Sequence, residues 1–364
     1  MDEPVTGTSP EGRTPPVEES AGSPQRSGNR QASNPAPPPG GGDPASEPPG
    51  IPGPGAPKPR ISRSLKLRLY SAAIIVPLVI SVILWGGIPF LLTVVMIIIL
   101  GLHEFYDILE IKGLRPQKLP GLVGGALLGI VTYIGNEYWT NVLLTVVLLV
   151  VMILQLLKQD IAEAIGSISA TFFGVFYVGW LMAHVILLRR MDEILRLKYN
   201  SPAEGPFFIG SVILDKNLGI FLVIFCIAAV AGSDIGAYFV GRRFGRTKLA
   251  PRISPNKTVE GAFGGLATGV LFGVIAWFVF RIWVFHREVF PIGQALVLSL
   301  VLSIFGVLGD LAESLIKRDA HAKDAGTLLP GMGGILDRID SNMVAFPVLY
   351  YYMSAWFFLR SLGG

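Results

Sequence analysis

Nine apolar runs, each close to the length that crosses a bilayer, constrain this chain more than any other feature of its sequence. About 20 residues of helix span the roughly 30 Å of hydrocarbon in a membrane. Backbone groups in lipid must find partners within their own segment, so the runs are expected to be helices. The composition agrees, since 51% of residues are hydrophobic and 15% are charged. The sequence therefore predicts an all-α polytopic membrane protein, a bundle of about nine transmembrane helices. The expected spans are 67–86, 89–107, 119–136, 140–157, 164–188, 217–240, 260–282, 291–310 and 342–361.

The beginning of the chain differs from this apolar remainder. Residues 1–59 are rich in Pro, Gly and Ser and hold few large apolar side chains. Such a segment buries too little surface to offset its chain entropy, so 1–59 is expected to be a disordered cytosolic tail. Residues 60–364 are expected to form one transmembrane domain, because runs such as GAFGGLATGVLFGV carry the small residues that let helices pack closely. Cys226 lies inside a run, which predicts buried packing rather than a disulfide.

Lysine and arginine residues predict the orientation of the bundle. Those that precede the first run are Lys58, Arg60, Arg63, Lys66 and Arg68. They place the N-terminus in the cytosol, and the crossings then put three basic connections, 112–118, 242–257 and 317–338, on the same side. The basic connection at 189–200 opposes this pattern from the predicted outer side. No organelle-targeting segment is visible, so we expect a multi-pass protein of a bacterial inner membrane. Its net charge of +4 indicates topology rather than nucleic-acid binding.

Two polar stretches fall on the predicted cytosolic side, and the first covers residues 233–261. Six lysines and arginines crowd into the 16 positions from 242 to 257, and glycines among them allow close approach of backbone to a ligand. An ordinary basic loop explains the composition, whereas hydroxyl and amide groups just before a helix favour phosphate binding at its N-terminus. The candidate binding residues are Asp234, Arg242, Lys248, Ser254, Asn256, Lys257 and Thr258.

The second polar stretch, residues 310–341, brings many charges to the mouth of the last two runs. Charge at the membrane is costly and usually marks function. If the helix that begins at 291 continues, one of its faces carries Asp310, Glu313, Ser314, Lys317 and Arg318. Asp337 and Asp340 share a face of the next helix. Opposed carboxylates could hold Mg²⁺, which takes a few of them with water and phosphate oxygens, while interfacial ion pairs are the alternative.

Other polar residues carry weaker signals. His103 and Glu104 stand near the expected end of the second helix and are interpreted as interfacial anchors rather than ligands. No HExxH, GxSxG or Walker A pattern is present, so hydrolase and P-loop mechanisms lack a nucleophile or a phosphate cradle.

The segment Ser314–Asp340, SLIKRDAHAKDAGTLLPGMGGILDRID, closely resembles the signature of the phosphatidate cytidylyltransferase family. The shared features are a K-R pair, a K-D pair, P-x-x-G-G and the ending D-R-x-D. Residues 233–261 also resemble the family, in D-x-G-A-Y, G-R-x-F-G-R-x-K and I-S-P-x-K-T-x-E-G. Met332 is a departure, because the family usually has His there and a thioether supplies no acid, base or charged donor.

The resemblance implies that CTP and phosphatidate react in the bilayer to give CDP-diacylglycerol and pyrophosphate. Mg²⁺ is then the expected cofactor, with a monovalent cation such as K⁺ beside it by analogy. The implied metal ligands are Asp310, Asp337 and Asp340. The residues expected to act on the reacting phosphates are Lys257, Lys317, Arg318, Lys323, Asp324 and Arg338. The residues expected to place the substrates are Asp234, Arg242, Lys248, Ser254, Asn256, Thr258 and Ser314. A second copy of the chain, in a homodimer, is a further expected partner.

Three other functions stay open at this point. A CTP-dependent transferase or kinase acting on a polyprenol or an ether lipid would need similar residues. A transporter would have its charges near the middle of the membrane, whereas these charges gather at one face. A non-catalytic scaffold would explain the Pro-rich tail and none of the charged motifs.

Overall fold

The computed structural model describes residues 63–362 apart from short gaps, with residues 63–72 and 137 described by their backbone alone. The gaps are 136, 159–160, 203–204, 211, 287–288, 323–324 and 327–332. The predicted tail at 1–59 lies outside the described residues and stays a prediction.

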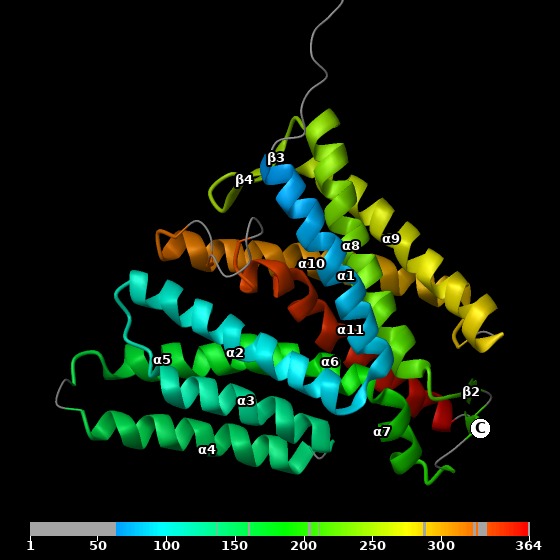
Figure 1. Ribbon diagram of the computed structural model, residues 1–364, viewed down its shortest axis with the longest axis horizontal. Helices are drawn as coiled ribbons and strands as arrows, with labels where there is room; N and C mark the ends of the chain where they lie inside the picture. The colour runs from blue at the N-terminus through cyan, green and yellow to red at the C-terminus, as the bar shows by residue number, and fades with distance from the viewer. Residues whose placement is uncertain are drawn as a thin grey trace, which may run out of the picture. The chain divides into compact units, whose positions relative to one another are not determined.

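Each expected span corresponds to a long helical segment among the described residues (Figure 1). The earlier ones are α1 (Arg63–Trp85), α2 (Gly87–Ile111), α3 (Lys118–Ile134), α4 (Glu137–Leu156), and α5 (Ala164–Gly174) continued by a π-helical turn η1 (Val175–Trp180) and α6 (Leu181–Arg189). The later ones are α8 (Leu218–Phe244), α9 (Val259–Phe280) continued by η2 (Arg281–Phe285), α10 (Ile292–Asp319) and α11 (Leu336–Leu362). Six described segments are long and apolar enough to cross a membrane, and α1 and α3 contribute shorter apolar helices. The all-α polytopic class is confirmed.

Small residues bring α8 and α9 into close contact, as the sequence predicts. A Cβ added to Gly265 would lie 2.7 Å from the carbonyl oxygen of Ser233, and one added to Gly236 would overlap the Thr268 side chain. The Thr268 hydroxyl donates to the carbonyl of Gly232 at 2.9 Å. Cys226 on α8 is fully buried, so its expected packing role is confirmed. This close pair of helices carries the first polar stretch at one end (Figure 1).

The basic connection at 189–200 is not a loop, because most of it forms helix α7 (Met191–Lys198). Its arginines bind groups of the protein itself. Arg189 donates to a backbone carbonyl of α1 at 2.7 Å, Arg190 pairs with a carboxylate of α7 at 2.5 Å, and Arg196 donates to two carbonyls just beyond α7. These arginines therefore serve local structure, and the orientation of the bundle stays a prediction.

Two short antiparallel hairpins complete the described secondary structure. The segment 201–216 contains β1 (Phe207–Ile209) paired with β2 (Val212–Leu214). The second hairpin pairs β3 (Lys248–Ala250) with β4 (Ser254–Thr258), in the basic connection between α8 and α9.

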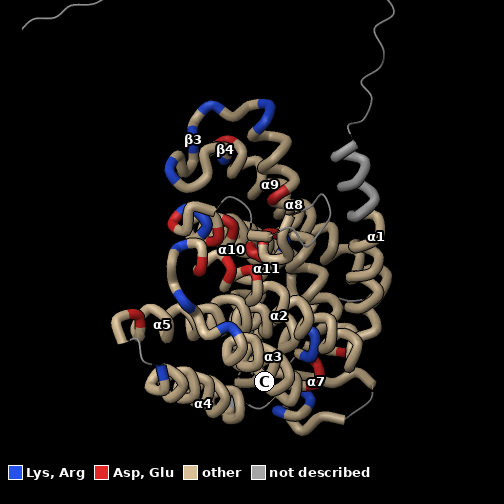
Figure 2. The backbone as a smooth tube through the Cα atoms, turned by 60° about the vertical axis from the view of Figure 1, so that its left-hand side comes forward, with Lys and Arg blue, Asp and Glu red and all other residues tan. Residues whose placement is uncertain are grey.

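The three basic connections predicted to share one membrane side contact each other. Lys112, after α2, forms an ion pair with Asp319 at the end of α10. Arg318 donates through Nε to the carbonyl oxygen of Ile253, beside β4, at 3.2 Å. Figure 2 shows basic positions along the β3–β4 segment and acidic positions near α10 and α11, next to helices that are mostly uncharged. The polar stretches therefore meet at one end of the bundle.

Candidate active site

A cleft of about 500 Å³ lies where α8, α9, α10 and the β3–β4 hairpin meet. Its walls combine small and apolar residues with charged and hydrogen-bonding ones from both predicted stretches. The polar residues that line it are Asp234, Tyr238, Arg242, Asn256, Lys257, Thr258 and Asp310. Six of these seven are predicted site residues, and Tyr238 is the addition. Asp310 comes from the second stretch and the others from the first, so the fold unites segments that the sequence separates.

The start of α9 holds the hairpin in place. Thr258 is the N-cap residue in an extended conformation, and its hydroxyl accepts a hydrogen bond from the amide of Gly261 at 3.1 Å. Glu260, in the first turn of α9, accepts from the backbone amides of Arg246 and Thr247, each at 3.1 Å. These bonds tie the basic segment to the helix, and they fix Lys257 at the edge of the cleft.

Arg242 was predicted to lie on a loop, but α8 continues through it to Phe244. Its guanidinium donates to the hydroxyl of Tyr238, one turn earlier, at 2.8 Å. This contact between residues four apart requires the extra helical turn and directs Arg242 along the wall of the cleft.

Lys257 and Asp310 form an ion pair across the cleft, with Nζ 2.7 Å from Oδ2. Their side chains remain 24% and 33% exposed. The other oxygen of Asp310 accepts from the hydroxyl of Ser314 at 3.3 Å. The Lys257 Nζ atom is buried and makes no hydrogen bond of good geometry among the described residues, so its ion pair with Asp310 leaves bonding capacity for a ligand that enters the cleft. A lysine in this state suits an incoming phosphate.

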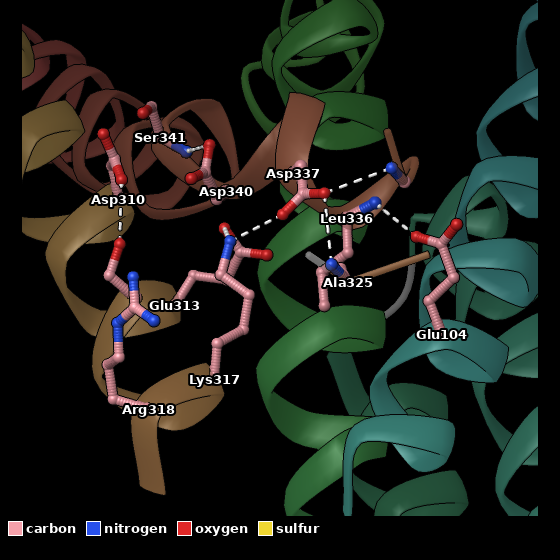
Figure 3. A network of polar contacts seen from close by, with 12 residues as sticks. Glu104, Asp310, Glu313, Lys317, Arg318, Ala325, Leu336, Asp337, Asp340 and Ser341 are labelled. Carbon is pink, nitrogen blue, oxygen red and sulfur yellow. Dashed lines mark hydrogen bonds and ion pairs between the residues drawn. The ribbon is translucent and has the colours of Figure 1, made fainter. Parts of the chain in front are cut away.

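A second pair, between Lys317 and Asp337, lies deeper in the protein (Figure 3). Lys317 Nζ is 2.6 Å from Asp337 Oδ1 and 3.1 Å from an oxygen of Glu313, which is 1% exposed. The other oxygen of Asp337 accepts from the amides of Ala325 and Gly334 at 3.2 and 3.1 Å. Burial favours a higher pKa for Asp337, but the hydrogen bond and charge of Lys317, with the two amides, hold that pKa below its usual value. We call Glu313, Lys317 and Asp337 the buried cluster.

Asp340 lies one turn beyond Asp337 and is 8% exposed. One of its oxygens accepts from the amide of Ser341 at 2.6 Å. A Cβ added to Gly309 would lie 2.6 Å from the carbonyl oxygen of Asp340, so Asp340 packs beside the part of α10 that carries Asp310. Asp310 and Asp234 both line the cleft. Within the described ranges, no group of three or more His, Cys, Asp or Glu residues is arranged to hold an ion unaided.

The remaining predicted residues fall in several places. Ser254 is part of β4, Lys248 is exposed on β3, and Arg338 is in the first turn of α11. Lys323, Asp324 and Met332 lie outside the described residues, so their predicted roles gain nothing from the structure. The expected helical continuation from 291 is confirmed, since α10 reaches Asp319.

The interpretation of Glu104 as an interfacial anchor is wrong. Helix α2 continues to Ile111, beyond the expected end, and Glu104 is 2% exposed. Its Oε2 accepts a hydrogen bond from the amide of Leu336, 232 residues away, at 2.8 Å (Figure 3). A single carboxylate beside a histidine gave no local signal of this contact, which only the tertiary fold creates.

A smaller cavity of about 210 Å³ lies between α3, α4, α6 and α11. Thr132, Asn141, Trp180 and Tyr350 are among the residues that line it. It contains none of the predicted site residues, so we assign the chemistry to the larger cleft.

Comparison with known proteins decides the family. The family model for the cytidylyltransferase family matches residues 66–356, which is most of the chain. The chain belongs to the cytidylyltransferase family. Relatives of the chain include three proteins that carry the name phosphatidate cytidylyltransferase. The one from Synechocystis is 34% identical over 290 residues, covering 79% of this chain and 95% of the relative. The one from Bacillus subtilis is 31% identical over 296 residues (80% and 98%), and the one from Brucella suis is 35% identical over 290 (79% and 93%). The matched range of this cytidylyltransferase includes both polar stretches and excludes the predicted tail.

Proposed function

We propose that the protein transfers the cytidylyl group of CTP to phosphatidate, forming CDP-diacylglycerol and pyrophosphate within the membrane. The observation that carries this proposal is the cleft, in which Lys257 of one polar stretch meets Asp310 of the other, in a chain of this family. A lipid phosphate oxygen bonds to the α-phosphorus of CTP, and the bond from that phosphorus to the bridging oxygen of the β-phosphate breaks. The lipid oxygen is already a nucleophile, so no serine or cysteine is needed.

The central difficulty of this reaction is that both substrates are polyanions. Cations that neutralise charge and fix geometry are the usual solution for phosphoryl chemistry. In this proposal Lys257 and Arg242 receive the triphosphate from the cleft wall, and Asn256 and Thr258 help to place the nucleotide. Arg318 lies against the hairpin and completes the basic side of the site.

The carboxylates around the cleft fit Mg²⁺, which binds through one or two carboxylates together with water and substrate phosphates. Asp310 is the first ligand in this proposal because its pair with Lys257 is partly exposed, and Asp340 packs against Gly309, the residue before Asp310. Asp337 joins them only if Lys317 releases it, since both of its oxygens already have partners. When bound, Mg²⁺ would stabilise the negative charge that develops on the phosphates. A companion monovalent cation and a homodimer remain predictions.

We also propose that the cleft faces the cytoplasm of a bacterial inner membrane. CTP is a cytosolic nucleotide, and the lysines and arginines at positions 58–68 favour the same orientation. The acyl chains of the lipid would stay in the bilayer, beside exposed apolar side chains of α8 and α9 such as Phe239 and Phe263.

The direct test is transfer of label from α-³²P CTP into chloroform-soluble lipid by the purified protein, with phosphatidate micelles and Mg²⁺. Label should move only when both are present and should be lost with EDTA. Parallel reactions with a polyprenol phosphate and with an ether-lipid phosphatidate would reveal another lipid substrate. Absence of transfer to every lipid, by protein with a cooperative thermal transition, would contradict the proposal.

A further inference from the structure

Glu104 makes a contact that the proposed chemistry does not use. It belongs to α2, yet its Oε2 accepts from the amide of Leu336, the first residue of α11. The first amides of a helix have no partner within it, and a carboxylate there is favoured by hydrogen bonding and by the helix dipole. The residues just before Leu336 are Gly334 and Ile335, which offer no side-chain acceptor. Glu104 therefore supplies from a distant helix the cap that α11 lacks.

The glycines around this carboxylate show how closely the chain packs against it. A Cβ on Gly326 would lie 2.5 Å from Glu104 Oε1, and a Cβ on Gly334 would lie 2.6 Å from Oε2. A Cβ on Gly334 would also come within 2.8 Å of the amide nitrogen of Gly326. Oε1 has no hydrogen-bond partner in the part of the chain that the structure describes. Both glycines thus meet at the Glu104 carboxylate, and side chains at these positions would collide with it.

The same short region of backbone carries Asp337 of the buried cluster. Asp337 follows Leu336 directly and accepts from the amide of Gly334, while pairing with Lys317. Figure 3 shows Glu104 and Asp337 approaching this backbone from two sides, with Asp340 further along α11. Any shift of the first turn of α11 would displace both aspartates together.

We infer that Glu104 is a positioning residue, which fixes the first turn of α11 and thereby places Asp337, Lys317 and Asp340 without touching substrate. The inference rests on the proposed function for its kinetic consequence, but the cap itself is independent of any reaction. It predicts that the hydrogen bond matters more than the charge, because a glutamine oxygen can accept the same bond.

The first experiment compares Glu104→Gln and Glu104→Ala with His103→Ala, whose exposed side chain is the adjacent matched control. The alanine variant should lower kcat about 10–100-fold, as loss of a supporting hydrogen bond does at other sites. Its KM for CTP should change by less than about twofold, because Glu104 does not line the cleft. The glutamine variant should recover kcat to within about threefold of wild type. Equal losses in both variants, or a rise in KM with kcat unchanged, would overturn the inference.

A second experiment tests the hydrogen bond between Glu104 and the start of α11 without measuring turnover. Hydrogen exchange of a peptide covering residues 334–341 should accelerate in Glu104→Ala and stay close to wild type in Glu104→Gln and His103→Ala. Unchanged exchange in the alanine variant would refute the cap. If the wild-type protein transfers no label to any lipid, the proposed function fails, and this exchange result still decides the role of Glu104.

A double-mutant cycle with Gly326→Ala tests the close packing and remains informative if Glu104→Ala folds poorly. Gly326→Ala alone should lower kcat about tenfold, because its Cβ would collide with the carboxylate. With Glu104→Ala already present, adding it should cost less than about twofold, since the colliding atoms are gone. If Glu104→Ala does not fold, Gly326→Ala with wild-type kcat would contradict the packing. Independent, additive losses in the cycle would contradict it equally.

Discussion

Two lysine–aspartate pairs, built from the same chemistry, have opposite surroundings in this molecule. Lys257 and Asp310 lie 2.7 Å apart with side chains 24% and 33% exposed, and they line the cleft. Lys317 and Asp337 lie 2.6 Å apart with side chains 12% and 15% exposed, and the remaining aspartate oxygen holds two backbone amides. The first pair has bonding capacity left for a ligand, whereas the second is satisfied by the protein.

The difference separates groups that act on substrate from groups that build the site. A partly exposed pair contributes less to stability than a buried one, so exchanging its partners for phosphate or metal costs less. Breaking a buried pair by removing one partner leaves an unpaired charge and costs about 3–5 kcal/mol. We therefore expect the cleft pair to govern turnover and the buried cluster to govern the integrity of the site.

The largest effect should come from Lys257→Met, which removes the cleft cation and keeps the length of the side chain. We expect kcat/KM for CTP to fall about 10³-fold, close to 4 kcal/mol. Removing one preorganised donor to a reacting phosphate loses about this much transition-state stabilisation. Label transfer from CTP measures it. Lys158→Met, at an exposed site after α4, is the matched control and should stay within about twofold. A loss of less than about tenfold in Lys257→Met would place the triphosphate elsewhere.

The main effect of Asp337→Asn should be on the stability of the fold. We expect the free energy of unfolding to fall by about 2 kcal/mol, because Lys317 keeps Glu313 at 3.1 Å but loses its charged hydrogen bond to Asp337. A lower thermal midpoint in detergent checks this result. Lys257→Met should leave the midpoint near wild type in the same experiment. Equal thermal midpoints for the two variants would contradict the claim that the buried pair contributes more to stability than the cleft pair.

Arg318→Ala should have an intermediate effect. Its Nε bond to the carbonyl of Ile253 joins α10 to the hairpin, and its side chain is exposed. We expect about a tenfold loss in kcat/KM, close to the value of one charged hydrogen bond. Arg318→Lys keeps the charge and should recover part of the loss. Wild-type kinetics in the alanine variant would show that this bridge does not matter.

Lys248→Ala should have the smallest effect, because Lys248 is exposed on β3 and does not line the cleft. It can attract CTP only through solvent, so KM should rise about threefold at low salt and approach wild type at about 0.5 M salt. Titration of CTP at both salt concentrations measures this. A salt-independent change would mean direct contact with the nucleotide.

Much of the fold could be predicted from hydropathy. The nine apolar runs each became a helix, since run length and backbone satisfaction in lipid leave little choice. The hairpins and α7 were missed because short elements depend on local tertiary contacts, such as those of Arg196 with carbonyls beyond α7. The ends of α2 and α8 were placed a turn early, at 107 and 240, because charged residues interrupt the apolar pattern near the end of each helix.

The sequence predicted which residues gather at the candidate site, but it predicted only part of what each residue does there. Asp234, Asn256, Lys257, Thr258 and Asp310 do line one cleft. The sequence could not show that Asp337 is enclosed by Lys317 and two amides while Asp310 remains open, because both are aspartates at the membrane end of a helix. The role of Glu104 depends on a contact across 232 residues, which no local pattern contains.

The most direct test is the Mg²⁺-dependent turnover of Asp310→Asn, measured by label transfer together with its thermal midpoint. We predict that turnover falls at least about 10²-fold, while the midpoint stays within a few degrees of wild type, because the pair with Lys257 is partly exposed. Wild-type turnover in Asp310→Asn would contradict the account of the cleft as the place where metal, CTP and lipid phosphate meet.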